Sequence, residues 1–147
     1  MEKILVTGGA GNIGSSLVKA LLKRKGSSVY VFDNLLTGKK ENLPFKNSNL
    51  IFKECNINNI TELESAWEDN IFDFVFHYAA LVGVSRTQLN PLAVLNDVDG
   101  IKNILKMSSA TGTKRIFFSS SSEVYGEPVE IPQNEDTTPL NSRIPYA

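Results

Sequence analysis

Residues 3–14 read Lys3-Ile-Leu-Val-Thr7-Gly8-Gly9-Ala10-Gly11-Asn12-Ile13-Gly14, and this stretch decides the fold. Its first part is a short apolar run typical of a buried strand, and apolar residues recur at helical spacing from Ile13 onward. The glycines therefore occupy a turn from a strand into a helix, where the backbone bends tightly and approaches a ligand without a Cβ clash. Because the following helix directs unpaired N–H groups at the turn, the stretch predicts a pyrophosphate site.

A second apolar run ends in an acidic residue that suits the same site. Asp33 follows Val29-Tyr-Val-Phe32 and lies about 20 residues after Gly14, where a carboxylate accepts hydrogen bonds from the ribose hydroxyls of a dinucleotide. This carboxylate would repel a 2′-phosphate, so we expect NAD rather than NADP. NADP is the alternative cofactor, because Lys39 and Lys40 would meet such a phosphate if their loop folded back.

The glycines fit two registers. Gly9-x-Gly11-x-x-Gly14 alone is weak evidence, since it also occurs in ordinary tight turns, but an unliganded turn leaves the placement of the acid unexplained. The second register, Thr7-Gly8-x-x-Gly11-x-x-Gly14, resembles the extended short-chain dehydrogenase/reductase family, with its NAD-dependent nucleotide-sugar epimerases and dehydratases. The resemblance covers essentially the whole chain. It implies cofactor contacts from five residues of the turn: Gly8, Gly11, Asn12, Ile13 and Gly14.

Length and composition allow one compact domain. The chain has 147 residues, a hydrophobic share of 41% and a formal net charge of −1. Without a basic excess we expect no nucleic-acid partner. No apolar run reaches bilayer length and no signal sequence precedes the first strand, so we expect a cytoplasmic protein without membrane contact. The single cysteine, Cys55, excludes an internal disulfide, suggests no metal site and is expected in the core.

The predicted elements alternate between strand and helix, which indicates an α/β fold with a parallel sheet covered on both faces. Right-handed crossovers favour a doubly wound, Rossmann-type sheet with strand order 3-2-1-4-5. We predict a surface loop with a short helix over residues 34–47. The predicted strands are residues 3–7, 28–33, 49–54, 72–77 and 114–119. The predicted helices are residues 12–25, 61–69 and 91–111. Residues 1–147 then form one NAD-binding domain.

The predicted helix over residues 91–111 carries two apolar sets. The first is expected to pack on the sheet and consists of Val94, Val98, Ile101 and Leu105. The second consists of Leu95, Ile104 and Met107. In the resembled family this helix often forms a homodimer, although a well-covered monomer surface explains the same residues. Asp97 stands where the family commonly has asparagine, which leaves the local hydrogen-bond polarity open.

The resemblance extends the cofactor site to the ends of later strands. The implied contacts are Asn34, Asn56, Ile57, Ala79, Ala80 and Ser119. Asn56 replaces an aspartate that accepts a bond from the adenine amino group; an amide oxygen can accept it too, but an exposed polar turn residue is the alternative. His77 is the only histidine. We interpret it as a buried, hydrogen-bonded residue at a strand end rather than a catalytic one.

The segment after the fifth strand resembles the active-site edge of this family. Aligned on Val124-Tyr125-Gly126, Ser121 takes the place of the serine or threonine that hydrogen-bonds the reacting sugar oxygen. Tyr146 takes the place of the catalytic tyrosine, whose phenol shuttles a proton as hydride moves between the sugar C4 and NAD. Glu123 takes the place of a proton-transfer residue of dehydratases. If the chain is extended there, Ser121 and Glu123 share one face.

The resemblance leaves the reaction open. The family's lysine, one helical turn after its tyrosine, falls beyond Ala147 together with the substrate region, so we expect the N-terminal portion of a longer enzyme, inactive alone. Asp33 and residues 34–43 resemble UDP-glucose 4-epimerases, which makes a UDP-sugar the expected substrate. Residues 121–123 resemble 4,6-dehydratases and decarboxylases instead. A non-catalytic dinucleotide sensor on the same fold is a further alternative.

Overall fold

The computed structural model describes residues 1–81 and 83–142. The chain forms two compact units. The first, called the sheet unit, comprises Met1–Ala80 and Asn96–Ser119, and the second unit comprises Leu81–Leu95 and Ser120–Ala147. The expectation of one domain over the whole chain stays a prediction. Among the described residues, no helix is both long and apolar enough to cross a membrane.

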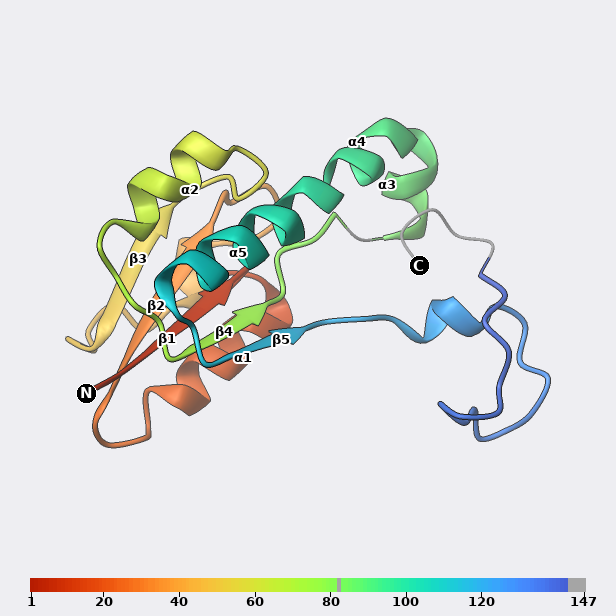
Figure 1. Ribbon diagram of the computed structural model, residues 1–147, viewed down its shortest axis with the longest axis horizontal. Coiled ribbons are helices and arrows are strands. Elements are labelled where there is room, and N and C mark those ends of the chain that lie inside the picture. The colour runs from red at the N-terminus through yellow and green to blue at the C-terminus, as the bar shows by residue number, and fades with distance from the viewer. Residues whose placement is uncertain (82, 143–147) are drawn as a thin grey trace. The chain divides into compact units, whose positions relative to one another are not determined.

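The sheet unit contains a parallel sheet with strand order β3-β2-β1-β4-β5, which confirms the predicted topology (Figure 1). Its strands are β1 (Glu2–Thr7), β2 (Ser27–Asp33), β3 (Leu50–Glu54), β4 (Phe74–His77) and β5 (Arg115–Phe118). Thr7 pairs with Phe32 of β2 and with His77 of β4. The carboxyl ends of β1, β2 and β4 therefore finish at the same level on one edge of the sheet.

Helices α1, α2 and α5 cover the two faces of this sheet. The α-helices are α1 (Asn12–Leu21), α2 (Ile60–Trp67), α3 (Val84–Leu89), α4 (Pro91–Asn96) and α5 (Val98–Thr111). Two 3₁₀ turns are η1 (Lys40–Asn42), inside the predicted loop, and η2 (Ser122–Tyr125). The helix predicted over 12–25 is shorter, because i→i+3 type bonds close its last turn and Gly26 then takes a positive φ of 82°.

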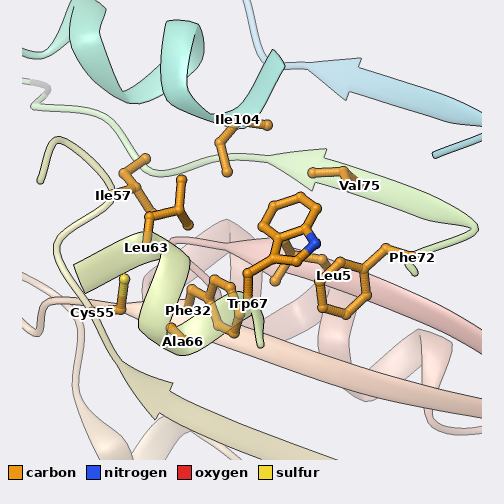
Figure 2. Close-up of a cluster of buried hydrophobic side chains, with 10 residues drawn as sticks. All are labelled: Leu5, Phe32, Cys55, Ile57, Leu63, Ala66, Trp67, Phe72, Val75 and Ile104. Atoms are coloured by element: carbon orange, nitrogen blue, oxygen red, sulfur yellow. The ribbon is translucent and has the colours of Figure 1, made fainter. Parts of the chain in front are cut away.

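Side chains alternate between two cores along β1. Ile4 and Val6 of β1 pack with α1, whereas Leu5 between them packs with α2 and α5. Figure 2 shows the indole of Trp67 beside Leu5, with Ile104 approaching from α5. The indole N–H donates to the carbonyl oxygen of Asn70 at 2.9 Å, so burial leaves this donor satisfied.

Cys55 belongs to the core that faces α2 and α5, as predicted. Burial, and to a smaller degree the nearby Glu62 carboxylate, raise the pKa of its thiol to about 11. The thiol is therefore protonated at neutral pH and packs as a small apolar side chain.

The region predicted as one helix over 91–111 differs from the prediction. A turn at Asp97 separates α4 from α5. Four residues were expected to be buried, and all four lie in the described part of the chain. Val94 is the only one of the four that is buried. Val98 and Leu105 are 48% and 49% exposed, whereas Ile104 is fully buried. A short helix, α3, also lies where none is predicted, since fewer than two turns give little periodicity.

Gly100, the one glycine in α5, determines which face of this helix packs against the core. A Cβ on Gly100 would lie 2.5 Å from Asn58 Oδ1 and 2.9 Å from the Cδ1 of Ile57, so the helix approaches the turn after β3 through this position. Residues one and two turns later then point inward, and these are Ile104 and Ser108. The expected stripe was wrong because apolar periodicity alone carries no information on this close approach.

Candidate functional site

The glycine turn between β1 and α1 is shaped by close backbone contacts. Gly8 has a φ of +67°, and a Cβ on it would lie 2.6 Å from the amide nitrogen of Ala79. A Cβ on Gly14 would collide with the carbonyl oxygen of Gly8. At Gly11 a Cβ would approach, among the described atoms, only Gly8 O at 3.2 Å. Protein packing thus requires glycine at Gly8 and Gly14, whereas Gly11 leaves a cradle over the turn that a phosphate can fill.

The first turn of α1 opens onto this cradle. Within the described part of the chain no side chain caps the helix and no acidic residue lies in its first turn. Asn12 is exposed and Ile13 is 70% exposed. Because the first N–H groups of a helix lack intrahelical partners and the dipole is positive there, this end suits an anion.

Asp33 lies beside the glycine turn with both carboxylate oxygens oriented by backbone groups. The N–H of Ala10 donates to Oδ2 at 2.9 Å, and the N–H of Leu35 donates to Oδ1 at 2.8 Å. Asp33 is 6% exposed. Since a carboxylate oxygen can accept more than one hydrogen bond, each oxygen retains capacity for a ribose hydroxyl. Asn34, the next residue, is exposed, and its side-chain oxygen accepts a bond from Leu36 N–H at 3.0 Å.

The end of β4 is tied to the end of β1 through a threonine. Thr7 Oγ1 accepts a hydrogen bond from Ala79 N–H at 3.3 Å and lies 2.9 Å from His77 Nδ1. Burial lowers the pKa of His77 to about 4, although Asp97 acts in the opposite direction. The imidazole is thus neutral at pH 7, which confirms the interpretation of His77 as a buried, hydrogen-bonded residue. Ser119 N–H donates to the carbonyl oxygen of His77 at 3.2 Å.

The turn after β3 is anchored on α5. Asn56 Oδ1 accepts a bond from the N–H of Asn58 at 3.1 Å, and Asn103 Nδ2 donates to the carbonyl oxygen of Ile57 at 2.9 Å. Ile57 is 5% exposed and packs in the core, so a cofactor role for it rests on its backbone. Asn58 Nδ2 donates to Asp97 Oδ1 at 3.0 Å, which shows Asp97 acting as an acceptor here.

Ser121 and Glu123 belong to one tight turn in the second unit. Ser121 is extended, with φ −134° and ψ 143°, but Glu123 lies within η2, and its N–H donates to Ser121 Oγ at 3.3 Å. The expectation that the chain is extended at both residues is therefore wrong for Glu123, because Ser121 caps a 3₁₀ turn that contains it. Gly126 follows with φ +65°. Tyr146 lies outside the described residues.

Two contributors to this geometry were missed from the sequence. Ala10 provides the N–H that orients Asp33, and Gly38 has no side chain where a Cβ would lie 2.8 Å from Asp33 Oδ1. Gly38 was visible in the sequence only as a turn former. Within the described residues, no group of three or more His, Cys, Asp or Glu side chains is arranged to hold a metal ion.

A parallel sheet, a glycine turn into an uncapped helix and an acid at the end of β2 together define a dinucleotide-binding domain of the Rossmann type. The chain belongs to the NAD dependent epimerase/dehydratase family, which it matches over residues 4–147, and its cofactor is NAD. The open cradle at the turn and the carboxylate of Asp33 fit this cofactor.

Several 4-epimerases that are similar to this chain are considerably longer than it. It is 38% identical over 154 residues to a UDP-glucose 4-epimerase of Cyamopsis tetragonoloba, covering 99% of this chain and 43% of that protein. The UDP-Glc/GlcNAc 4-epimerase of Campylobacter jejuni has a TM-score of 0.89 at 32% identity, over 99% of this chain and 45% of that one. A Thermus thermophilus UDP-glucose 4-epimerase in complex with NAD has a TM-score of 0.87 at 34% identity, over 98% and 46%. The chain thus spans less than half the length of these relatives.

Proposed function

We propose that this chain is the NAD-binding part of a nucleotide-sugar 4-epimerase acting on a UDP-sugar. The observation that carries the proposal is the carboxylate of Asp33, held by Ala10 N–H beside a glycine turn that opens onto an uncapped helix end. The similarity to UDP-glucose 4-epimerases supports the substrate class. NAD, when bound, supplies a nicotinamide that exchanges hydride with the sugar C4.

The cofactor roles divide along the edge of the sheet. The cradle at Gly11 and the first N–H groups of α1 hold the pyrophosphate, and Asp33 accepts bonds from the adenosine ribose. Asn34 and Asn56 contact the adenosine. The small residues Ala79 and Ala80, together with Ser119, leave room for the nicotinamide ribose and ring.

The charges around Asp33 favour NAD over NADP. Its carboxylate opposes a 2′-phosphate, and Lys40, one of the two cations nearby in sequence, is already paired. The Lys40 ammonium lies 3.0 Å from the Glu54 carboxylate and 5.3 Å from the centre of the Phe52 ring. The Glu54 carboxylate partly neutralises the Lys40 ammonium, so this lysine attracts a 2′-phosphate less strongly.

Ser121 and Tyr146 carry the proton chemistry in this proposal. Ser121 Oγ accepts a bond from the backbone of Glu123, so its own hydroxyl hydrogen is free to donate to the sugar oxygen. The Tyr146 phenol removes or returns the proton of the C4 hydroxyl as hydride moves. Epimerisation needs no further acid or base, because the keto-sugar turns over in the site and is reduced on its other face.

A 4,6-dehydratase or decarboxylase is the second candidate, and Glu123 is the residue that favours it. Dehydration removes a proton and then a hydroxyl from the keto-sugar, which needs an acid and a base beyond the tyrosine. In the capped turn of η2 the N–H of Glu123 donates to Ser121 Oγ at 3.3 Å, so the two residues are in direct contact. A dinucleotide sensor without chemistry would need neither residue.

Calorimetry on the chain tests the cofactor assignment. We expect NAD to bind at least about tenfold more tightly than NADP, a difference of about 1.4 kcal/mol. The Asp33→Asn variant should lose this preference, because the neutral amide no longer repels a phosphate. Asp69→Asn, at an exposed aspartate, is the matched control and should change nothing. Equal binding of the two cofactors by the unaltered chain would refute the assignment.

Product analysis on the protein encoded by the complete gene separates the two reactions. An epimerase should interconvert UDP-glucose and UDP-galactose, lose turnover in Ser121→Ala and retain it in Glu123→Gln. A dehydratase should instead stall in Glu123→Gln with reduced cofactor and keto-sugar bound, visible as the absorbance of reduced nicotinamide. That second pattern would remove 4-epimerisation as the function.

A further inference from the structure

Both backbone groups of Ala10, in the middle of the glycine turn, are bound by the last residue of β2 and the segment that follows it. Its N–H donates to Asp33 Oδ2 at 2.9 Å. Its carbonyl oxygen accepts two hydrogen bonds, from Asn42 Nδ2 at 2.8 Å and from the N–H of Lys39 at 3.1 Å. We call residues 34–42 the ribose loop. The side chain of Asn42, at the far end of this loop, thus fastens it back onto the glycine turn.

The fastened loop encloses the carboxylate of Asp33. A Cβ on Gly38 would lie 2.8 Å from Asp33 Oδ1 and 3.0 Å from the Cβ of Ala10, so the loop backbone is packed directly against both residues. On the other side Leu35 donates its N–H to Oδ1 at 2.8 Å while holding a φ of +58°, which is unusual for a branched side chain. A displacement of the loop would therefore move or release the carboxylate.

We propose that Asn42 is a positioning residue for cofactor selectivity, which it controls by fastening the ribose loop to Ala10 so that Asp33 faces the ribose. This role rests on the proposed function, because it has meaning only if the site binds NAD. Asn42 acts through Asp33.

The position of the ribose loop affects the choice between NAD and NADP as well as the affinity for NAD, because the loop carries Lys39 and Lys40. In the fastened loop Lys40 is held against Glu54 at 3.0 Å, and the N–H of Lys39 is bound to Ala10. Releasing the loop weakens the orientation of the carboxylate that accepts from the ribose. It also frees the two lysines from these fixed positions, where either can approach a 2′-phosphate. Loss of Asn42 therefore weakens NAD binding without weakening NADP binding.

Asn42→Asp is the sharpest variant, because it has nearly the same size but removes the donor and sets a carboxylate oxygen against the Ala10 carbonyl oxygen. Asn47→Asp is its matched control: it makes the same change of charge nearby in the chain. Asn47 Oδ1 accepts a bond from Asn49 N–H at 3.0 Å, which a carboxylate still accepts. Asn42→Ala removes the donor without adding charge, and Gly38→Ala presses a methyl group against the carboxylate from the other side.

The test is calorimetric measurement of NAD and NADP affinity for the chain and its four variants, with Trp67 fluorescence to confirm that each is folded. We expect the ratio of NAD to NADP affinity to fall about tenfold in Asn42→Asp, the equivalent of losing about one hydrogen bond. Asn42→Ala and Gly38→Ala should lower the ratio in the same direction. Asn47→Asp should leave it unchanged.

The outcomes separate this inference from the proposed function. If the unaltered chain does not bind NAD, both fail. If it binds NAD selectively but the Asn42 variants weaken NAD and NADP equally, Asn42 only supports the fold and the inference is overturned alone. An unchanged ratio in the folded Asn42 variants overturns it in the same way. Should Asn42→Asp not fold, Asn42→Ala and Gly38→Ala decide the question by the same ratio.

Discussion

His77 is a buried residue whose protonation makes the stability of the sheet unit depend on pH. It is 4% exposed, lies 2.9 Å from Thr7 Oγ1 through Nδ1 and stacks on Phe118 with ring centres 5.7 Å apart. Burial lowers its pKa from 6.5 to about 4, and Asp97 offsets only part of this effect. The neutral imidazole is therefore part of the folded core.

We predict that the chain loses stability in mildly acidic solution because of His77. The folded-state pKa lies below the unfolded value, so the unfolded chain binds the proton first. The stabilisation is complete above pH 6.5 and is lost as the pH falls toward 4. Between about pH 7.5 and pH 5 the free energy of unfolding should fall by roughly 2 kcal/mol from this group.

Urea denaturation at the two pH values, followed by Trp67 fluorescence, measures this effect. His77→Gln keeps a polar side chain but does not titrate, so its stability should vary much less over the same range. Both pH values lie above the range in which most carboxylates are protonated. A slope in His77→Gln as steep as in the unaltered chain would assign the pH dependence to other groups.

At the scale of secondary structure, the buried face of α5 differs from the face that the sequence predicts to be buried. Ile104 is fully buried against the sheet, whereas its neighbour Leu105 is 49% exposed. We predict that Ile104→Ala lowers the free energy of unfolding by about 2–5 kcal/mol, since it leaves a cavity in a packed core. Leu105→Ala should cost less than about 1 kcal/mol.

Each of these two variants serves as the control for the other. Isoleucine and leucine have the same number of atoms and similar helix propensity, and the two residues are consecutive in α5. Urea midpoints measured by circular dichroism compare them directly. If Leu105→Ala were the more damaging change, the originally expected stripe would be the buried face.

The strands and their order could be predicted because each contains a continuous apolar run of three or four residues, and because right-handed crossovers leave few topologies. The burial of α5 could not, because it depends on Gly100 meeting Ile57 and Asn58, a contact between segments distant in sequence. Within the site, the glycines and Asp33 were predictable because their spacing is local. The fastening of Ala10 by Asn42 was not, since one hydrogen bond across a loop leaves no periodic signal.

At the scale of the whole chain, the proposed cofactor contacts are concentrated in one unit. The glycine turn, Asp33, the turn after β3, and Ala79, Ala80 and Ser119 all belong to the sheet unit. Ser121 and Glu123 belong to the second unit. NAD binding should therefore be a property of the sheet unit that does not require sugar.

The single tryptophan allows this to be measured, because Trp67 is fully buried in the core of the sheet unit. A ligand that binds only the folded state stabilises it by about 2.7 kcal/mol at a concentration of 100 times its dissociation constant. We predict that NAD at such a concentration, with no sugar present, raises the urea midpoint of Trp67 fluorescence by this free energy divided by the denaturant slope m. NADP at the same concentration should raise it much less, and Asp33→Asn should remove the difference between the cofactors. If NAD left the midpoint unchanged although calorimetry detected binding, the cofactor would be held by residues outside the sheet unit.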